Sequence, residues 1–110
     1  MKKSKAVYFT DEKRNRIKLE EIAGKVIFSD RQPSISGDIA LSLKIRQKEK
    51  YNLIIVGMGL EPVRVGENIR AFYREIGSNS QKNFLAYEIL DKKGDGVLGR
   101  WSDIGCKFED

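Results

Sequence analysis

The chain has 110 residues, of which 40% are hydrophobic and 34% are charged, and 21 basic against 16 acidic side chains give a formal net charge of +5. A chain of this length buries roughly 60 to 70% of its unfolded surface, so we expect residues 1–110 to fold as a single domain. Apolar residues recur throughout, which argues against disorder, and the longest apolar run, Leu53 to Val56, is far shorter than the ~18 to 20 residues of a membrane helix, so no membrane partner is expected.

The first residues are basic, and residues 1–5 are expected to form a flexible basic tail. The apolar stretch that follows, Ala6 to Phe9, stops at polar residues and is too short for the hydrophobic region of a secretion signal. Cys106 is the only cysteine, whereas small secreted domains often carry paired cysteines. These observations predict an intracellular, cytoplasmic protein.

The positive charge is concentrated at the start of the chain. Residues 1–18 hold seven basic and two acidic side chains, a net of +5, while the remaining 92 residues sum to zero. One hypothesis is contact with nucleic acid or another polyanion, which would weaken steeply with added salt. The alternative is a solvated terminus, which the scarcity of interleaved aromatic residues favours. The residues that would bind a polyanion on the first hypothesis are Lys13, Arg14, Arg16, Lys18, Arg70 and Arg74.

The first third of the chain is predicted to contain strands at 5–10 and 25–29. Residues 15–21 fit a strand that pairs back across the polar turn at 11–14. The apolar spacing from Leu19 to Val26 also fits a helix, and we favour the strand.

The clearest element is a hairpin formed by residues 39–46 and 51–58. The first run alternates apolar and polar residues, which is typical of a half-buried strand, and a four-residue connection leads to the second run. The pairing that places Leu43 opposite Ile54 gives one apolar face. The other face of the second run is also apolar, which predicts an interior strand covered on both sides.

The expected cover is an amphipathic helix near 67–76. Its apolar residues recur with helical spacing at Ile69, Phe72, Tyr73 and Ile76. Gly77 follows where a left-handed C-terminal cap is favourable. Arg70 and Arg74, four residues apart, would share an exposed face of this helix and could hold an anion, although a solvated surface is the simpler interpretation.

A second hairpin is predicted between residues 83 and 101, around a Gly-rich turn. Pairing the strands outward from the turn sets Tyr87 beside Arg100, where the ring could stack on the guanidinium. It also aligns Trp101 with Ala86, which is ordinary core packing. The predicted fold is therefore α+β: a curved, barrel-like antiparallel sheet of about six or seven strands with one packed helix. An all-β sandwich is the alternative.

Few residues suggest catalysis. The absence of histidine removes His-based triads and imidazole metal sites, and Cys106 has no histidine to act as its base. Gly57 and Gly59 imitate the start of a dinucleotide-binding loop but lack its third glycine. The turn at 91–96 imitates half of a calcium loop, with a lysine at the third position. The sequence therefore predicts a protein that is not an enzyme and needs no cofactor or metal.

Three functions fit these features. The favoured hypothesis is a small binding or inhibitory module that docks on a protein partner, and the free sheet edges would also allow a homodimer. The second is the nucleic-acid or polyanion binder described above. The third is a small-molecule-binding domain with its pocket between sheet and helix. The residues expected to line that pocket are Tyr51, Tyr73, Tyr87, Glu88, Arg100 and Trp101, and Glu88 is the most informative because a carboxylate there is either an edge charge or a buried functional group.

Overall fold

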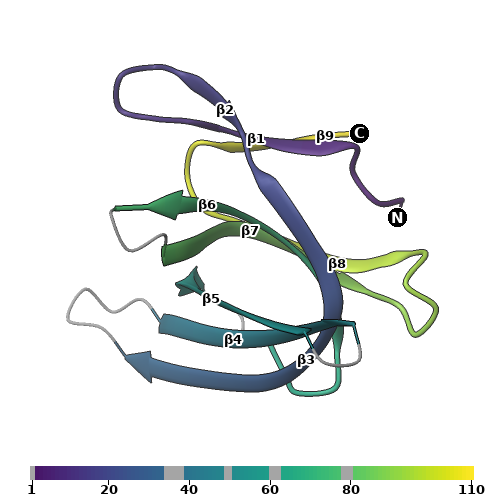
Figure 1. The fold of residues 1–110 in the computed structure, drawn as a ribbon. Helices are drawn as coiled ribbons and strands as arrows, with labels where there is room; N and C mark the ends of the chain where they lie inside the picture. Colours follow the sequence, from purple (N-terminus) through teal and green to yellow (C-terminus); the bar gives the residue numbers. More distant parts are fainter. Residues whose placement is uncertain (1, 34–38, 49–50, 60–62, 78–80) are drawn as a thin grey trace.

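The computed structural model describes residues 2–33, 39–48, 51–59, 63–77 and 81–110. The described residues form nine strands and no helix (Figure 1). The strands are β1 (Ala6–Thr10), β2 (Arg16–Lys18), β3 (Glu20–Pro33), β4 (Ile39–Lys48), β5 (Tyr51–Gly59), β6 (Asn68–Ile76), β7 (Gln81–Leu90), β8 (Val97–Ser102) and β9 (Cys106–Glu109). Nothing in this part of the chain is a helix that could cross a membrane.

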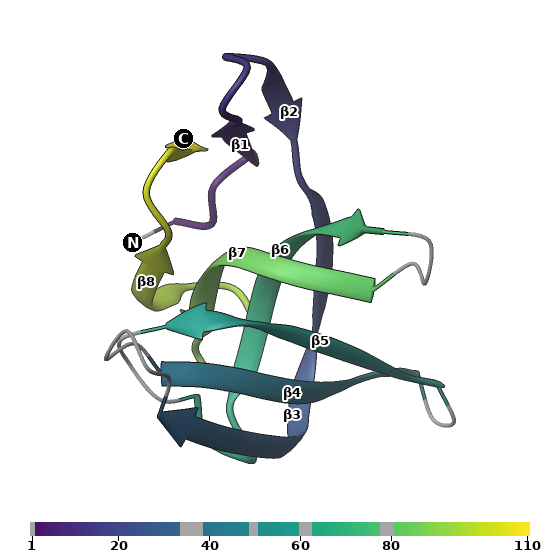
Figure 2. The ribbon, with the colours of Figure 1, turned by 90° about the vertical axis from the view of Figure 1, so that its left-hand side faces the viewer.

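The strands form two sheets. The larger sheet has the order β5-β4-β3-β6-β7-β8, and the smaller one has the order β2-β1-β9. One parallel contact, between Val56 on β5 and Asn83 on β7, closes the larger sheet on itself (Figure 2). Strands β3 to β7 thereby form a closed ring of five strands. The first of them, β3, pairs with the second, β4, and with the fourth, β6. The third, β5, runs parallel to the fifth, β7. This is the pairing order of OB-type barrels.

Strand β3 is long enough to serve both halves of the barrel. Its first six residues, Glu20 to Lys25, pair with β6, and the residues from Lys25 onward pair with β4. A bulge between Val26 and Phe28 marks the bend (Figure 1), because an extra residue in one strand increases its local twist. The predicted strand at 15–21 is confirmed in its pairing: β2 pairs back on β1, with Ile17 opposite Phe9.

The predicted helix at 67–76 is wrong, and the fold is all-β rather than α+β. These residues form β6, in the middle of the sheet between β3 and β7. Ile69 and Ala71 point into the barrel, while Arg70 and Phe72 point outward beneath other chain segments, and all four are buried. A strand that is covered on both faces lacks the alternation of apolar and polar residues by which strands are recognised. Without that alternation, the apolar residues of β6 matched the spacing expected of a helix.

The first hairpin exists, but its predicted register is off by one residue. Leu43 lies opposite Ile55, not Ile54, because a bulge between Arg46 and Lys48 shifts the pairing. A shift of one residue exchanges the two faces of a strand. Ile55 is therefore fully buried in the barrel core.

Two apolar clusters hold the fold together. The barrel interior contains Ile22, Val26, Leu41, Leu43, Ile45, Ile55, Val63, Ile69, Ala71, Phe84 and Tyr87. A second cluster, with Val7, Leu19, Phe72 and Ala86 at its centre, joins the outer face of β6 and β7 to the small sheet. The small sheet therefore covers one part of the barrel's outer face (Figure 1), whereas Lys25 and Phe28, at the bend of β3, are exposed.

Candidate functional site

The second hairpin separates the predicted pocket residues onto two faces of the sheet. Leu90 pairs with Val97 as expected, but a bulge between Ile89 and Leu90 shifts every later pair. Tyr87 consequently lies opposite Trp101, and Glu88 lies opposite Arg100. The expected pairings of Tyr87 with Arg100 and of Trp101 with Ala86 are therefore wrong, since the bulge moves the two aromatic residues to one face and the two charged residues to the other.

The aromatic half of the predicted pocket belongs to the barrel core. The Tyr87 and Trp101 rings stack with centroids 5.5 Å apart, and Phe84 contacts both rings edge-on. Tyr73 is partly buried against the same cluster. These rings pack against one another, as aromatic residues of a protein core do. Tyr51 lies on β5, and its side chain is outside the described part of the structure.

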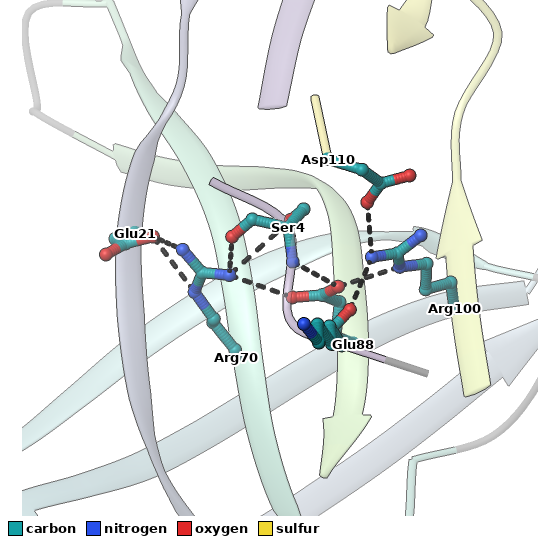
Figure 3. Close-up of polar contacts among 7 residues, drawn as sticks. Ser4, Glu21, Arg70, Glu88, Arg100 and Asp110 are labelled. Atoms are coloured by element: carbon teal, nitrogen blue, oxygen red, sulfur yellow. Dashed lines mark hydrogen bonds and ion pairs between the residues drawn. The ribbon is translucent and has the colours of Figure 1, made fainter. Parts of the chain in front are cut away.

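Glu88 is the centre of a buried ionic network (Figure 3). Its side chain is fully buried, and its oxygens accept hydrogen bonds from Arg70 Nη1 at 3.0 Å and from Arg100 Nε at 2.7 Å. The backbone N–H of Ser4 donates a further bond to Oε2. A buried carboxylate is unfavourable unless charged and hydrogen-bonding partners compensate for its lost water. Because both oxygens are occupied, the Glu88 carboxylate is held in place by its partners and is not free to act as a general base.

The N-terminal segment, Lys2 to Lys5, is fastened to the barrel by this network and is not the expected flexible tail. Ser4 is buried, and its carbonyl oxygen accepts a hydrogen bond from Arg70. Arg100 donates to the carbonyl of Lys2 and to the carboxylate of Asp110. Lys5 N–H donates to the carbonyl of Glu109 at 2.7 Å. Both ends of the described chain therefore meet at Arg100 (Figure 3).

The residues expected to form a basic arm do not share one surface. Arg70 is buried between Glu21 and Glu88 instead of lying exposed beside Arg74. Arg16 lies over the ring of Tyr8 and pairs with Glu109, and Arg14 adopts a left-handed conformation in the β1–β2 turn. Arg74 lies over the ring of Phe9 and lines a small pocket with Lys13, but Asp11 and Glu12 line the same pocket. Lys18 lies exposed on β2. Among the described residues, Arg16 has an acidic partner in Glu109, and the pocket lined by Lys13 and Arg74 also contains Asp11 and Glu12.

A concentrated positive surface occurs on the outer face of the barrel. Lys25 on β3 lies directly opposite Arg46 on β4, and both side chains are exposed. On the next outward-facing rung, Phe28 lies opposite Lys44, and 49% of Phe28 is exposed. None of the three cations forms an ion pair with another described residue. We call these residues the outer basic face: Lys25, Phe28, Lys44 and Arg46.

Two cations in directly opposed positions are unfavourable for the sheet itself. Like charges on cross-strand neighbours destabilise a β-sheet, and neighbouring strands lie only about 4.8 Å apart. Lys25 has no carboxylate paired with it among the described residues, and neither has Arg46. An anion bound between them would relieve this repulsion.

None of the four residues of the outer basic face was predicted from the sequence as a site residue. The signal for Lys44 and Arg46 was present, since both lie on the polar face of the predicted strand at 39–46. Their opposition to Phe28 and Lys25 depends on which strand pairs with β4 and on the bulge in β3. Neither can be read from local periodicity.

Metal ligands and Cys106 are the remaining groups to describe. The described residues contain no group of three or more acidic or cysteine side chains placed to hold a metal ion. Burial raises the pKa of the Cys106 thiol to about 11, and the negative charge of Asp103 acts in the same direction. The thiol is therefore protonated at neutral pH, which makes it a poor nucleophile.

Comparison with known protein families, with curated proteins and with solved structures finds no match for this chain. Function is therefore inferred from the geometry of the described residues.

Proposed function

We propose that the protein binds single-stranded nucleic acid across the outer basic face. The observation that carries this proposal is the direct opposition of Lys25 and Arg46, followed on the next rung by Lys44 beside a half-exposed Phe28. Proteins that bind single strands combine cations along the phosphate backbone with aromatic rings on which unpaired bases stack. The outer basic face supplies both within two neighbouring strands.

The barrel topology supports the part of this surface that lies on β4. In OB-type barrels, oligonucleotides or oligosaccharides bind on the face of the second and third strands. The second strand of this barrel is β4, which carries Lys44 and Arg46, while Lys25 and Phe28 lie beside them on the first strand, β3. The three cations favour a phosphate-bearing strand over a neutral oligosaccharide. The ring of Phe28 favours single strands over duplex, since the bases of a duplex are already stacked on one another.

The nucleic acid would thus contact the barrel and not the basic arm. A nucleic-acid ligand agrees with a cytoplasmic protein, which we also propose from the single cysteine. We propose no catalytic step.

Fluorescence anisotropy with labelled single-stranded oligonucleotides tests this function. The protein should bind at low salt and lose affinity steeply as salt rises, with a log-log slope of roughly 0.7 for each phosphate contact. Lys25→Gln with Arg46→Gln should weaken binding and lower the slope, and Phe28→Ala should weaken binding by about 10-fold through lost stacking. The matched control is Lys13→Gln with Lys18→Gln, which removes the same charge from the arm. An equal loss in the control, salt-insensitive binding or no binding would overturn the proposal.

A protein partner is the second candidate, and one feature favours it. Strand β8 is the edge of the larger sheet, pairing only with β7 among the described strands, and 73% of Leu98 on this strand is exposed. An open edge can accept a strand from another chain, including a second copy of this protein. Sedimentation equilibrium should then show a dimer that Leu98→Lys dissociates. A monomer at all concentrations would remove the homodimer.

A further inference from the structure

A groove lies next to the outer basic face, between the N-terminal segment and the β7–β8 turn. Lys3 stands on one wall, Lys92 and Lys93 stand on the other, and the floor contains Ala23, Gly24 and Leu90. The floor is continuous with the outer basic face in the sheet: Leu90 pairs with Asn68, Asn68 pairs with Lys25, and Lys25 pairs with Arg46. One row of cross-strand neighbours therefore leads from Arg46 into the groove.

The groove is positively charged. Its three lysines are exposed and form no ion pair with any described residue. Among the described residues that line the groove, Glu21 is the only carboxylate, and it already accepts hydrogen bonds from Arg70 Nε and Nη2. The charge of the lysines is therefore not neutralised from within the groove.

Both walls are fixed without a ligand. The carboxylate of Asp91 accepts backbone N–H bonds from Lys93, Asp95 and Gly96, each at 3.0 Å, and the Asn68 amide donates to the carbonyls of Asp91 and Lys92. The other wall is fixed by the contacts of Ser4 with Glu88 and Arg70. Preformed walls reduce the ordering that a ligand must impose when it binds.

The groove lies close to the end of the row of neighbours. Leu90 pairs with Val97 at the start of the edge strand β8, and a bridge between Lys2 and Gly96, the residue before Val97, joins the two walls there. A nucleic-acid strand that follows the row from Arg46 past Lys25 meets these joined walls. Three lysines also suit a terminal phosphate, which carries nearly two negative charges at neutral pH where an internal phosphodiester carries one.

We infer that this groove receives the terminal phosphate of a nucleic-acid strand held by Lys3, Lys92 and Lys93. The inference rests on the proposed function, because the rest of the strand lies on the outer basic face. A 5′-phosphate and a 3′-phosphate have the same chemistry, so the direction of the strand is an experimental question.

The test compares short oligonucleotides of one sequence with an internal fluorophore and with a 5′-phosphate, a 3′-phosphate or hydroxyl groups at both ends. One phosphorylated form should bind about 10-fold more tightly than the hydroxyl-ended form. This is the gain expected from charge-assisted hydrogen bonds to one phosphate group. Lys92→Gln with Lys93→Gln should remove this preference and leave the affinity for the hydroxyl-ended form nearly unchanged. A hydroxyl-ended oligonucleotide with one additional nucleotide controls for total charge.

The outcomes separate the two proposals. If all oligonucleotides bind equally and Lys25→Gln with Arg46→Gln weakens them, the inference is overturned and the proposed function stands. If the Lys92 and Lys93 substitutions weaken phosphorylated and hydroxyl-ended forms by the same factor, the groove contributes only general attraction, and the inference fails. If the wild-type protein binds no oligonucleotide at low salt, the proposed function fails, and this inference fails with it.

Discussion

Glu88 and Arg100 face each other across β7 and β8, with Arg100 Nε 2.7 Å from Glu88 Oε2. The pair exists because the bulge beside Leu90 shifts the hairpin by one residue. In the register without the bulge, Arg100 would lie beside Tyr87. The bulge thus places the positive charge of Arg100 beside the fully buried carboxylate of Glu88. The stability of this hairpin should therefore depend on both residues.

Removing Arg100 should destabilise the protein strongly. Arg100→Ala leaves Glu88 buried with Arg70 as its only cationic partner among the described residues, so we expect the free energy of unfolding to fall by about 2 to 4 kcal/mol. Urea denaturation measures the change. The matched control is Arg16→Ala, because Arg16 pairs with Glu109 at an exposed position and should contribute less than about 1 kcal/mol. Equal effects of the two substitutions would contradict the role assigned to the network.

Deletion of residues 1–4 should also destabilise the fold, although a flexible tail could be removed without effect. The deletion takes away the Ser4 N–H from Glu88 and the Ser4 carbonyl from Arg70, and each unsatisfied buried group costs about 1 to 3 kcal/mol. Thermal unfolding compares the deletion with Lys3→Ala, which shortens one exposed side chain. A deletion variant as stable as wild type would show that these contacts contribute nothing.

Gly24→Ala should disrupt the corner of the barrel at which β3 meets both β4 and β6. A methyl group at this position would lie 2.1 Å from the Arg46 carbonyl oxygen, so the two strands would have to separate. We expect a loss of about 2 to 3 kcal/mol or more, as for other overpacked sites. Gly99→Ala is the control, because a methyl group at Gly99 meets no atom within 4 Å. Nucleic-acid affinity should fall with Gly24→Ala if the pairing of Lys25 with Arg46 matters for binding.

Cys106 should react slowly with alkylating reagents at neutral pH. Burial raises its pKa from 9.0 to about 11, so the folded protein holds the thiol proton more tightly than the unfolded chain does. The stabilisation from this difference is complete below pH 9.0 and is lost as the pH rises through about 11. Alkylation rates measured from pH 7 to 11, with and without urea, check both statements. Rapid modification of the folded protein at pH 7 would contradict the raised pKa.

The sequence predicted the strand-rich chain and both hairpins. Apolar residues at every second position, such as Leu41, Leu43 and Ile45, indicate a half-buried strand without any knowledge of its neighbours. The sequence did not predict the registers, since the bulges after Arg46 and before Leu90 leave no local signature. It failed at β6, where burial of both faces removes the alternation that separates strand from helix.

The candidate site was harder to predict than the fold. Glu88 was expected to line a pocket with Trp101, whereas it lies on the other face of the sheet in an ionic network, and its partners come from distant segments, the nearest of which is Arg100. The outer basic face depends in the same way on long-range pairing, because Lys25 and Arg46 become neighbours only when β3 and β4 adopt their observed register.

The adjacency of the two chain ends has a mechanical consequence. β1 and β9 run antiparallel, with Ala6 opposite Glu109, so a force that pulls the termini apart acts on one pair of the ladder at a time. Such unzipping needs less force than shearing many hydrogen bonds at once. Once the contacts of Lys2 and Ser4 are broken, the small sheet should peel away first, and the barrel, closed by its own strands, should rupture in a separate event that single-molecule stretching would resolve.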